Sequence, residues 1–565
     1  MDERTHRSGA PPDLGERAAD AVLGANPFVG IDPRELAEAA ASLLDRVGRT
    51  PGLLAAAGGE VARGLGGILA GRSDIRPGPR DGRFTNSAWS DNGAYRRLMQ
   101  SYLLVSAELR ALIERTDLDE PTAARALFAL SLLTEAAAPT NMLLGNPAAV
   151  RRALETRGQS LVRGMRNLAV DLVTNGGMPS QVDPRPFQVG VNLAATPGAV
   201  VYRDDVMELI QYAPATDTVG QRPLLVVPPQ INKFYVLDLA PGRSLVEYAV
   251  SQGSTAFAIS WRQPNAAHRD WGLDTYVRAA GRAAEVVCEI TGSADCNVLG
   301  ICAGGIVLAL LLGHLAAGEN RRVHSATFGV TMLDTSPGSM LRDLATDRAV
   351  AAARWRSRRR GYLDGRDMAR VFAWMRPNDL VWNYWVNNYL MGNDPPAFDV
   401  LYWNSDTTRL PAMLHAEYLD LFQRNPLVGA GEISVLRTPI DLRRVRCDCY
   451  VMAGATDHIV PWQACYRIPR LMGGKVEFVL SSSGHVQSIV NPPGNPKASY
   501  CTNPRRARSP EAWLARAEKH SGSWWEHWGA WLVARSGERR SAPAVLGSGA
   551  HPARDPAPGR YVLER

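Results

Sequence analysis

The glycine-rich segment 300–305 places a cysteine where a reactive side chain would be exposed. It reads Gly-Ile-Cys-Ala-Gly-Gly, follows an apolar strand-like segment and opens the apolar, helix-like segment Ile306–Leu315. Glycines permit a sharp strand-to-helix turn that holds the central side chain strained and exposed. The start of the following helix favours an anion, so we expect Cys302 to be a better thiolate than a free cysteine. The pattern predicts a nucleophile elbow; the alternative is a small buried thiol in a glycine turn.

An acid and a histidine follow Cys302 along the chain. Asp457 lies just after one strand-like segment and His485 just after another. Both therefore fall at the carboxyl ends of strands, where open α/β sheets bind their ligands. His458 is the competing histidine, but it stands beside the acid rather than in the position of the base. The order nucleophile, acid, histidine is that of the α/β-hydrolase fold, so Cys302, Asp457 and His485 are predicted to form a catalytic triad.

Backbone N–H groups near the elbow are expected to bind the oxyanion of an acyl-transfer intermediate. The first donor is predicted to be Ala303, the residue after the nucleophile. The second is expected in the loop after an early strand, which reads Pro-Pro-Gln-Ile-Asn-Lys from residue 228. Prolines lack the donor, which leaves Gln230 or Ile231, and we take Ile231 as the prediction. The alternative is a rigid loop that serves only packing.

Six short segments beyond residue 200 are predicted to be the strands that position these residues. They are Pro223–Val227, Ala256–Ser260, Asn297–Leu299, Ala326–Leu333, Cys449–Ala453 and Val476–Leu480. Most are almost continuously apolar, as expected of parallel strands covered on both faces. They alternate with helix-like segments, which indicates a doubly wound α/β sheet.

The chain is expected to divide into five parts around this sheet. These are an N-terminal segment that is partly disordered (1–80), a helical N-terminal domain (81–195), an α/β-hydrolase core in two pieces (196–333 and 442–534), an insertion (334–441) and a disordered tail (535–565). Apolar residues recur at helical spacing within Tyr95–Leu133, and a further helix is expected near Arg34–Val47. The insertion is rich in Trp, Tyr and Asn, whereas the tail is rich in Ser, Ala, Pro, Gly and Arg.

Composition excludes several classes of protein. The net charge is +7 over 565 residues, but arginines are interspersed with acids, so no nucleic-acid partner is expected. The longest apolar run, Ile306–Leu312, is too short for a transmembrane segment, and no secretory signal is evident. The seven cysteines are irregularly spaced, which favours reduced thiols in a cytoplasm. We expect no metal site and no cofactor.

Together these segments resemble polyhydroxyalkanoate (PHA) synthases, which polymerise 3-hydroxyacyl-CoA into storage polyester. The motifs that carry the resemblance are Pro228–Tyr235, Ile259–Arg262, Asn387–Leu390, Leu401–Asn404, Asp457–Trp462 and Gly484–Pro493. The runs Ala138–Asn141 and Asn175–Asp183, with Gln230, look most like the class II branch, which is associated with medium-chain acyl groups. Gln263 departs from the Asn of many relatives, which bears on substrate range rather than catalysis.

The resemblance implies a cap domain over the active site, which suits the insertion at 334–441. It also implies a homodimer in the cytoplasm that associates with the surface of polymer granules. The expected reaction polymerises (R)-3-hydroxyacyl-CoA onto a growing polyester chain and releases CoA. Cys302 would carry the acyl group, His485 would act as base and Asp457 would orient the histidine, with a second role for Asp457 in activating the 3-hydroxyl left open.

Two other functions fit parts of the sequence. One is a cysteine-type hydrolase on the same scaffold: a thioesterase, lactone hydrolase or polyester depolymerase. The other is a non-catalytic protein of the granule surface that kept the fold. The long insertion and the thioester chemistry of a cysteine nucleophile favour acyl transfer over hydrolysis, and the intact Cys302, Asp457 and His485 argue against a non-catalytic protein.

Overall fold

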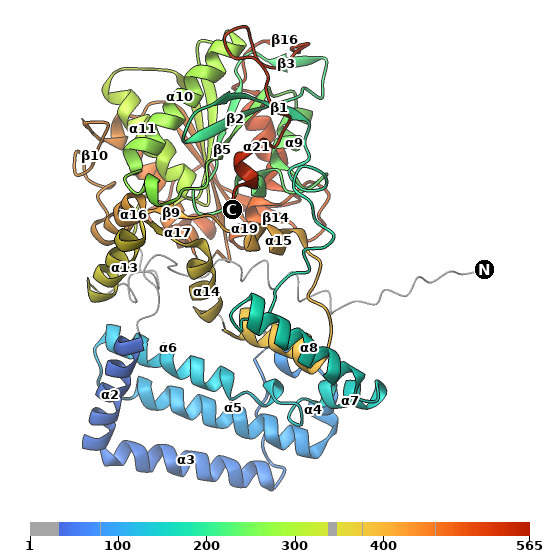
Figure 1. The fold of residues 1–565 in the computed structure, drawn as a ribbon. Helices are drawn as coiled ribbons and strands as arrows, with labels where there is room; N and C mark the ends of the chain where they lie inside the picture. The colour runs from blue at the N-terminus through green and yellow to red at the C-terminus, as the bar shows by residue number, and fades with distance from the viewer. Residues whose placement is uncertain (1–32, 79–80, 337–346, 376, 458) are drawn as a thin grey trace. The chain divides into compact units, whose positions relative to one another are not determined.

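The computed structural model describes residues 33–78, 81–336, 347–375, 377–457 and 459–565 (Figure 1). These residues fall into two compact units. Unit 1 is formed mainly by Gly30–Asp183 with Val371–Ala397, and unit 2 mainly by Pro184–Arg370 with Phe398–Arg565. All of the predicted site residues belong to unit 2.

Unit 2 is built on a ten-stranded sheet. Along the sheet its strands are β1 (Gly198–Arg203), β2 (Met207–Tyr212), β5 (Ala256–Trp261), β4 (Leu224–Val227), β6 (Cys296–Ile301), β7 (Val323–Gly329), β12 (Asp448–Gly454), β13 (Val476–Ser481), β14 (Ser499–Thr502) and β15 (Glu518–Ser521). The six inner strands, β5 to β13, run parallel to one another. At one edge β2 pairs antiparallel with both β5 and β1, and at the other edge β14 pairs antiparallel with both β13 and β15. Each inner strand overlaps one of the six predicted segments, although β7 ends at Gly329 rather than at Leu333, so the prediction of an α/β-hydrolase fold with a mostly parallel sheet is confirmed.

Helices cover both faces of this sheet, as Figure 1 shows. On one face α10 (Leu273–Thr291) and α11 (Ala303–Ala317) pack against β4 and β6. On the other face lie α9 (Leu245–Ser251) and α21 (Trp524–Val533), and the indole of Trp528 donates to Thr327 on β7 at 3.1 Å. The first eleven residues of α11 are all buried, as expected of a helix that is apolar on every side. This helix begins directly after Cys302.

Unit 1 is helical. Its longer helices are α2 (Pro33–Arg49), α3 (Pro51–Leu69), α5 (Gly93–Glu114), α6 (Glu120–Ala136), α7 (Pro147–Glu155) and α8 (Gln159–Thr174). The helices expected near residues 34–47 and 95–133 are therefore present as α2, α5 and α6. A short π-helical segment, η6 (Trp385–Leu390), packs against α8 so closely that a Cβ on Gly164 would lie 1.9 Å from the Tyr389 carbonyl oxygen. The Tyr389 hydroxyl donates to Asp171 on α8 at 2.7 Å.

The stretch expected as one insertion, 334–441, is divided between the two units. Its helices α13 (Asp347–Arg360), α15 (Asp399–Ser405) and α16 (Ala412–Arg424) lie in unit 2, and α14 (Gly365–Met375) spans the boundary. Residues 371–397 join unit 1 because η6 packs on α8, a contact between residues more than 200 positions apart. The boundaries at 81–195 and 334–441 therefore differ from the observed division. The cap role of this stretch stays a prediction.

The tail is ordered, so the prediction of a disordered segment at 535–565 is wrong. Its strand β16 (Arg539–Ser541) pairs with β3 (Thr218–Gly220), and the short helix η8 (Tyr561–Leu563) is partly buried. The buried ammonium of Lys233 donates to the carbonyl oxygens of Val562 and Glu564 at 2.6 and 2.7 Å. A few such anchors order a segment whose overall composition is that of a disordered one. The expectation of partial disorder for residues 1–32 lies outside the described residues.

Candidate active site

The turn between β6 and α11 places Cys302 at the carboxyl edge of the sheet. Cys302 has φ 51°, a left-handed conformation that is strained for a residue with a side chain. The neighbouring glycines make the turn possible, because a Cβ on Gly304 would lie 2.2 Å from the Val227 carbonyl oxygen and a Cβ on Gly305 would lie 2.0 Å from Thr331 Oγ1. The turn has the geometry of a nucleophile elbow, and its thiol is half-buried.

Asp457 and His485 meet beside this turn. Asp457 follows β12, and His485 is the first residue of α19 (His485–Ile489), which follows β13. His485 Nδ1 and Asp457 Oδ2 lie 2.7 Å apart, and both side chains are almost fully buried. The other carboxylate oxygen, Oδ1, accepts from the N–H groups of Ile459 and Val460 at 2.9 Å each. The aspartate is thus fixed by its own loop and in turn fixes the imidazole.

Both Asp457 and Cys302 affect the pKa of His485. Burial alone lowers the pKa of this imidazole, but the charges of Asp457 and Cys302, together with side-chain hydrogen bonds to both, raise its pKa to about 10. An imidazole with such a pKa holds its proton at neutral pH when the neighbouring sulfur is ionised. The structure thus brings together all three residues of the predicted triad.

The predicted oxyanion donors lie on the two segments that flank Cys302. Ala303 is the first residue of α11, where backbone N–H groups have no partner within the helix. Ile231 lies in the loop after β4, and Thr408 Oγ1 donates to the carbonyl oxygens of Gln230 and Ile231 at 3.0 and 2.5 Å. These contacts hold the loop, while its role as a donor stays a prediction. The competing residue His458 lies outside the described residues.

Sequence reasoning missed one group beside the nucleophile. Tyr418, on α16, is fully buried, and its phenol donates to Gln230 Oε1 at 2.7 Å. Burial raises the pKa of this phenol well above its ordinary value, and Cys302 is among the neighbouring charges that raise it further. Tyr418 thus lies within electrostatic range of Cys302. Residues 116 positions apart carry no local signal that could have predicted this neighbour.

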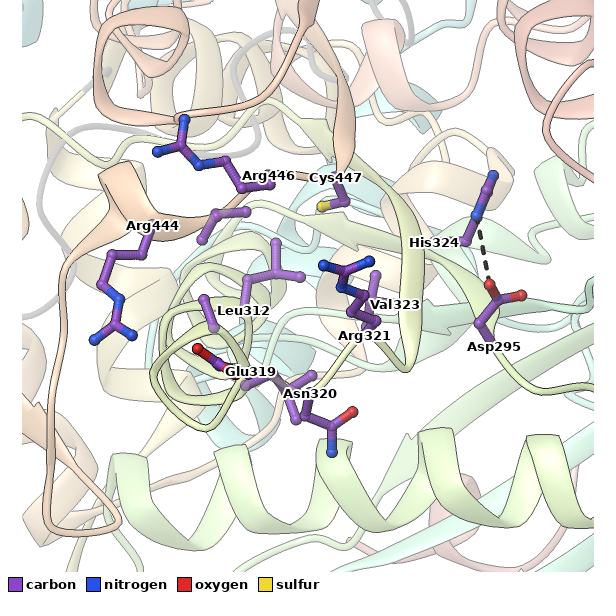
Figure 2. A pocket seen from close by; sticks show the side chains of 13 residues that line it. Asp295, Leu312, Glu319, Asn320, Arg321, Val323, His324, Arg444, Arg446 and Cys447 are labelled. Carbon is purple, nitrogen blue, oxygen red and sulfur yellow. Dashed lines mark ion pairs between the residues drawn. The ribbon is translucent and has the colours of Figure 1, made fainter.

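A separate hollow lies at the amino edge of the same sheet, opposite the edge that carries Cys302 (Figure 2). It has a volume of about 710 Å³ and is lined by residues at the amino ends of β6, β7 and β12, including Asp295, His324 and Cys447. It contains none of the predicted site residues. Among the residues that the structure describes, no group of three or more His, Cys, Asp or Glu side chains is arranged to hold a metal ion.

Within the described ranges, each helix is too short or too polar to cross a bilayer.

Two family models match the chain. One, described as the N-terminus of poly-beta-hydroxybutyrate polymerase (PhaC), matches residues 80–249. The other, described as the alpha/beta hydrolase fold, matches residues 223–492 and so includes Cys302, Asp457 and His485. The first match covers most of the helical region and the start of the sheet, and the second covers most of the sheet with its inserted stretch.

Curated relatives are similar over almost the whole chain. Poly(3-hydroxyalkanoate) polymerase 1 of Ectopseudomonas oleovorans is 50% identical over 553 residues, which cover 98% of this chain and 99% of the relative. Polymerase 2 of the same organism is 51% identical over 505 residues, 89% of this chain and 90% of the relative. A polymerase of Cupriavidus necator is 41% identical over 88% of this chain and 85% of its own. Half of the residues are thus shared along nearly the full length, and the chain belongs to the poly(3-hydroxyalkanoate) polymerase family, as its class II-like motifs predict.

Proposed function

We propose that the chain polymerises (R)-3-hydroxyacyl-CoA, with medium-chain acyl groups preferred, into poly(3-hydroxyalkanoate) and releases CoA. The observation that carries this proposal is His485, a buried imidazole bonded to Asp457 on one side and to Cys302 on the other. A cysteine nucleophile exchanges one thioester for another of similar energy, so acylation from CoA is close to reversible. Membership of the polymerase family supplies the substrate class.

Acylation begins from the thiolate of Cys302. The sulfur attacks the thioester carbonyl, and the resulting oxyanion is stabilised by the backbone N–H groups of Ala303 and Ile231. The bond from the carbonyl carbon to the CoA sulfur then breaks. The departing CoA thiolate takes the proton of the His485 imidazolium and leaves as the free thiol, so that the enzyme holds an acyl-Cys302 thioester and a neutral imidazole.

Elongation reverses these proton transfers. The neutral imidazole of His485 takes the proton of an incoming 3-hydroxyl, whose oxygen attacks the acyl-Cys302 thioester and forms the ester bond. The Cys302 thiolate leaves, and the thiolate–imidazolium pair is restored. Both oxygens of Asp457 are already occupied, one by His485 and one by two backbone N–H groups. This supports an orienting role for Asp457 rather than direct contact with the hydroxyl.

The proposal includes association with polymer granules in the cytoplasm and a homodimer. The granule association is supported by an apolar stripe on α8 in unit 1. Its side chains are well exposed: Val162, Met165, Leu172 and Val173. Spaced at three, seven and one residues, these side chains share one face of the helix and present apolar surface that would suit a polyester. Co-sedimentation with isolated granules, compared between the wild type and a variant with serine at these four positions, tests the association. Sedimentation velocity tests the dimer.

Product analysis tests the reaction itself. Purified chain is incubated with (R)-3-hydroxydecanoyl-CoA while CoA release and insoluble polymer are followed together. The proposal expects CoA and polyester in parallel. Free 3-hydroxydecanoic acid in place of polymer would identify a hydrolase, and no CoA release would point to a non-catalytic protein.

A further inference from the structure

A buried carboxamide in the loop after β4 has one end without a hydrogen-bond partner among the described residues. Gln230, directly after the two prolines that follow β4, is only 4% exposed. Its Oε1 accepts from the Tyr418 hydroxyl at 2.7 Å, but its Nε2 is buried without a hydrogen-bond partner in the described part of the chain. Buried polar groups are nearly always paired, because an unpaired donor loses its hydration and gains nothing in return. An unpaired donor that survives in a reaction site points to a ligand.

The loop that carries Gln230 begins directly against the nucleophile elbow. The carbonyl oxygens of Val227 and Pro228 lie so close to Gly304, two residues after Cys302, that a Cβ there would approach them to 2.2 and 2.7 Å. The loop that carries Gln230 therefore contacts the elbow itself. Tyr418, the partner of Gln230, is within electrostatic range of Cys302.

The carboxamide is also held rigidly. The Trp261 indole donates to the Pro228 carbonyl oxygen at 2.9 Å, and Thr408 Oγ1 donates to the Gln230 carbonyl oxygen at 3.0 Å. Tyr418 fixes the side chain from α16. Backbone and side chain are thus tied to three different elements, and the free N–H groups need no reorganisation to meet an incoming acceptor.

We propose that Gln230 is a further substrate-binding residue of the polymerase reaction, whose Nε2 donates a hydrogen bond to an oxygen of the acyl group bound at Cys302. Tyr418 acts through it as a positioning residue. The inference rests on the proposed function, because it needs the acyl group on Cys302. The alkyl part of the acyl group offers no acceptor. Its thioester carbonyl and its 3-oxygen are both acceptors, and both lie close to the sulfur.

Gln230→Leu removes the donor at nearly constant volume. We expect kcat/KM for (R)-3-hydroxydecanoyl-CoA to fall about 10- to 100-fold, the range for loss of one hydrogen bond to a group that carries or develops charge. Gln211→Leu is the matched control: Gln211 is equally buried on β2, but its Oε1 accepts from the Gly547 N–H far along the chain, outside the site. This control should lower Tm and leave kcat/KM of the folded protein unchanged.

The positioning role of Tyr418 has its own readout. Tyr418→Phe should lower kcat/KM in the wild-type background and add nothing to Gln230→Leu, because it acts only through the carboxamide. The double variant also removes both members of the hydrogen-bonded pair, so it separates loss of substrate binding from the cost of breaking the Gln230–Tyr418 hydrogen bond. Additive losses would overturn the positioning role.

Two substrates identify the acceptor. CoA release in a single turnover is compared for (R)-3-hydroxydecanoyl-CoA and decanoyl-CoA, which lacks the 3-oxygen. A loss in Gln230→Leu with both substrates assigns the donor to the thioester carbonyl, and a loss with the hydroxylated one alone assigns it to the 3-oxygen. If the wild type releases CoA and Gln230→Leu matches it within twofold on both, the inference is wrong. If the wild type itself releases no CoA, the proposed function fails instead.

Discussion

Two histidine–aspartate pairs lie at opposite edges of the same sheet, and they differ in almost everything except residue type. At the carboxyl edge, His485 and Asp457 lie 2.7 Å apart with side chains 3% and 0% exposed. At the amino edge, His324 and Asp295 lie 3.4 Å apart, 35% and 20% exposed, on the wall of the hollow in Figure 2. Burial and Arg222 lower the pKa of His324, whereas Asp457 and Cys302 outweigh burial and raise the pKa of His485 to about 10.

The difference shows what turns such a pair into a reaction site. Asp295 is shared with Arg222, whose Nε donates to it at 2.6 Å, so little of its charge is left for the histidine. Within the described residues Asp457 accepts from its own loop and from His485, and Cys302 is among the groups that raise the pKa of His485. Such a pair is suited to catalysis where it is buried, where its carboxylate is not also paired with an arginine and where a nucleophile lies nearby.

The largest effect is expected from the nucleophile. Cys302→Ala should abolish CoA release, a loss of at least about a thousandfold, because no other group can take the acyl chain. CoA release with (R)-3-hydroxydecanoyl-CoA measures it. Cys501→Ala is the control, since Cys501 is a partly exposed thiol on β14 outside the site, and it should retain wild-type activity. Polymerisation by Cys302→Ala would refute the assignment.

The two histidines should differ almost as strongly. His485→Gln removes the group that holds the proton between thiol and leaving group, so we expect a loss approaching that of Cys302→Ala. His324→Gln makes the same chemical change at the other edge of the sheet and should leave kcat/KM within about twofold, as usual for a surface substitution away from a site. Comparable losses in the two variants would mean that the amino edge takes part in the reaction.

Asp457→Asn should have a smaller effect than either triad partner. The amide keeps the shape of the side chain but removes the charge that orients and stabilises the imidazolium, and a loss of roughly 100- to 10,000-fold in kcat is expected. The rate of acylation, followed as CoA release in the first turnover, should fall along with the steady state. Wild-type kinetics in this variant would place the catalytic acid elsewhere.

The raised pKa of His485 also predicts how stability depends on pH. The folded pKa of about 10 lies above the 6.5 of an unfolded imidazole. The protonated ring therefore contributes stability that is fully present below about pH 6.5 and is lost as pH rises through about 10. In Cys302→Ala, which lacks one of the groups that raise the pKa, the loss should begin at a lower pH. Unfolding free energies of both proteins between pH 6 and 10 test this, and an identical pH dependence would contradict the thiolate–imidazolium pair.

The sequence predicted the centre of unit 2 better than its edges. The six parallel strands are apolar along their length and stood out, whereas β2 buries Glu208 and Gln211, and β15 is a polar stretch from Glu518 to Ser521. Edge strands carry polar side chains that short-range patterns assign to loops. The predicted order of nucleophile, acid and histidine rests on chain order, which is a property of the fold.

Contacts between distant residues were not readable. The Gln230–Tyr418 hydrogen bond joins residues 188 positions apart, and the tail is held by Lys233, more than 300 positions away from it. Neither leaves a periodic trace, since each depends on one or two side chains rather than on a repeated pattern. For the same reason the joining of residues 371–397 to unit 1, through contacts such as Tyr389 with Asp171, followed from no local feature.

The smallest effect is expected at Asp295. Asp295→Asn should leave CoA release unchanged, because none of the predicted catalytic residues lies at that edge of the sheet. It should nevertheless lower the pKa of His324 further, since Asp295 is among the groups that raise it against burial and Arg222. Loss of the partly exposed Arg222–Asp295 ion pair should cost about 1 kcal/mol or less. An NMR titration of His324 and a thermal unfolding curve measure the two effects. A rise in the pKa of His324, or a loss of activity, would show that the two pairs are more alike than their burial indicates.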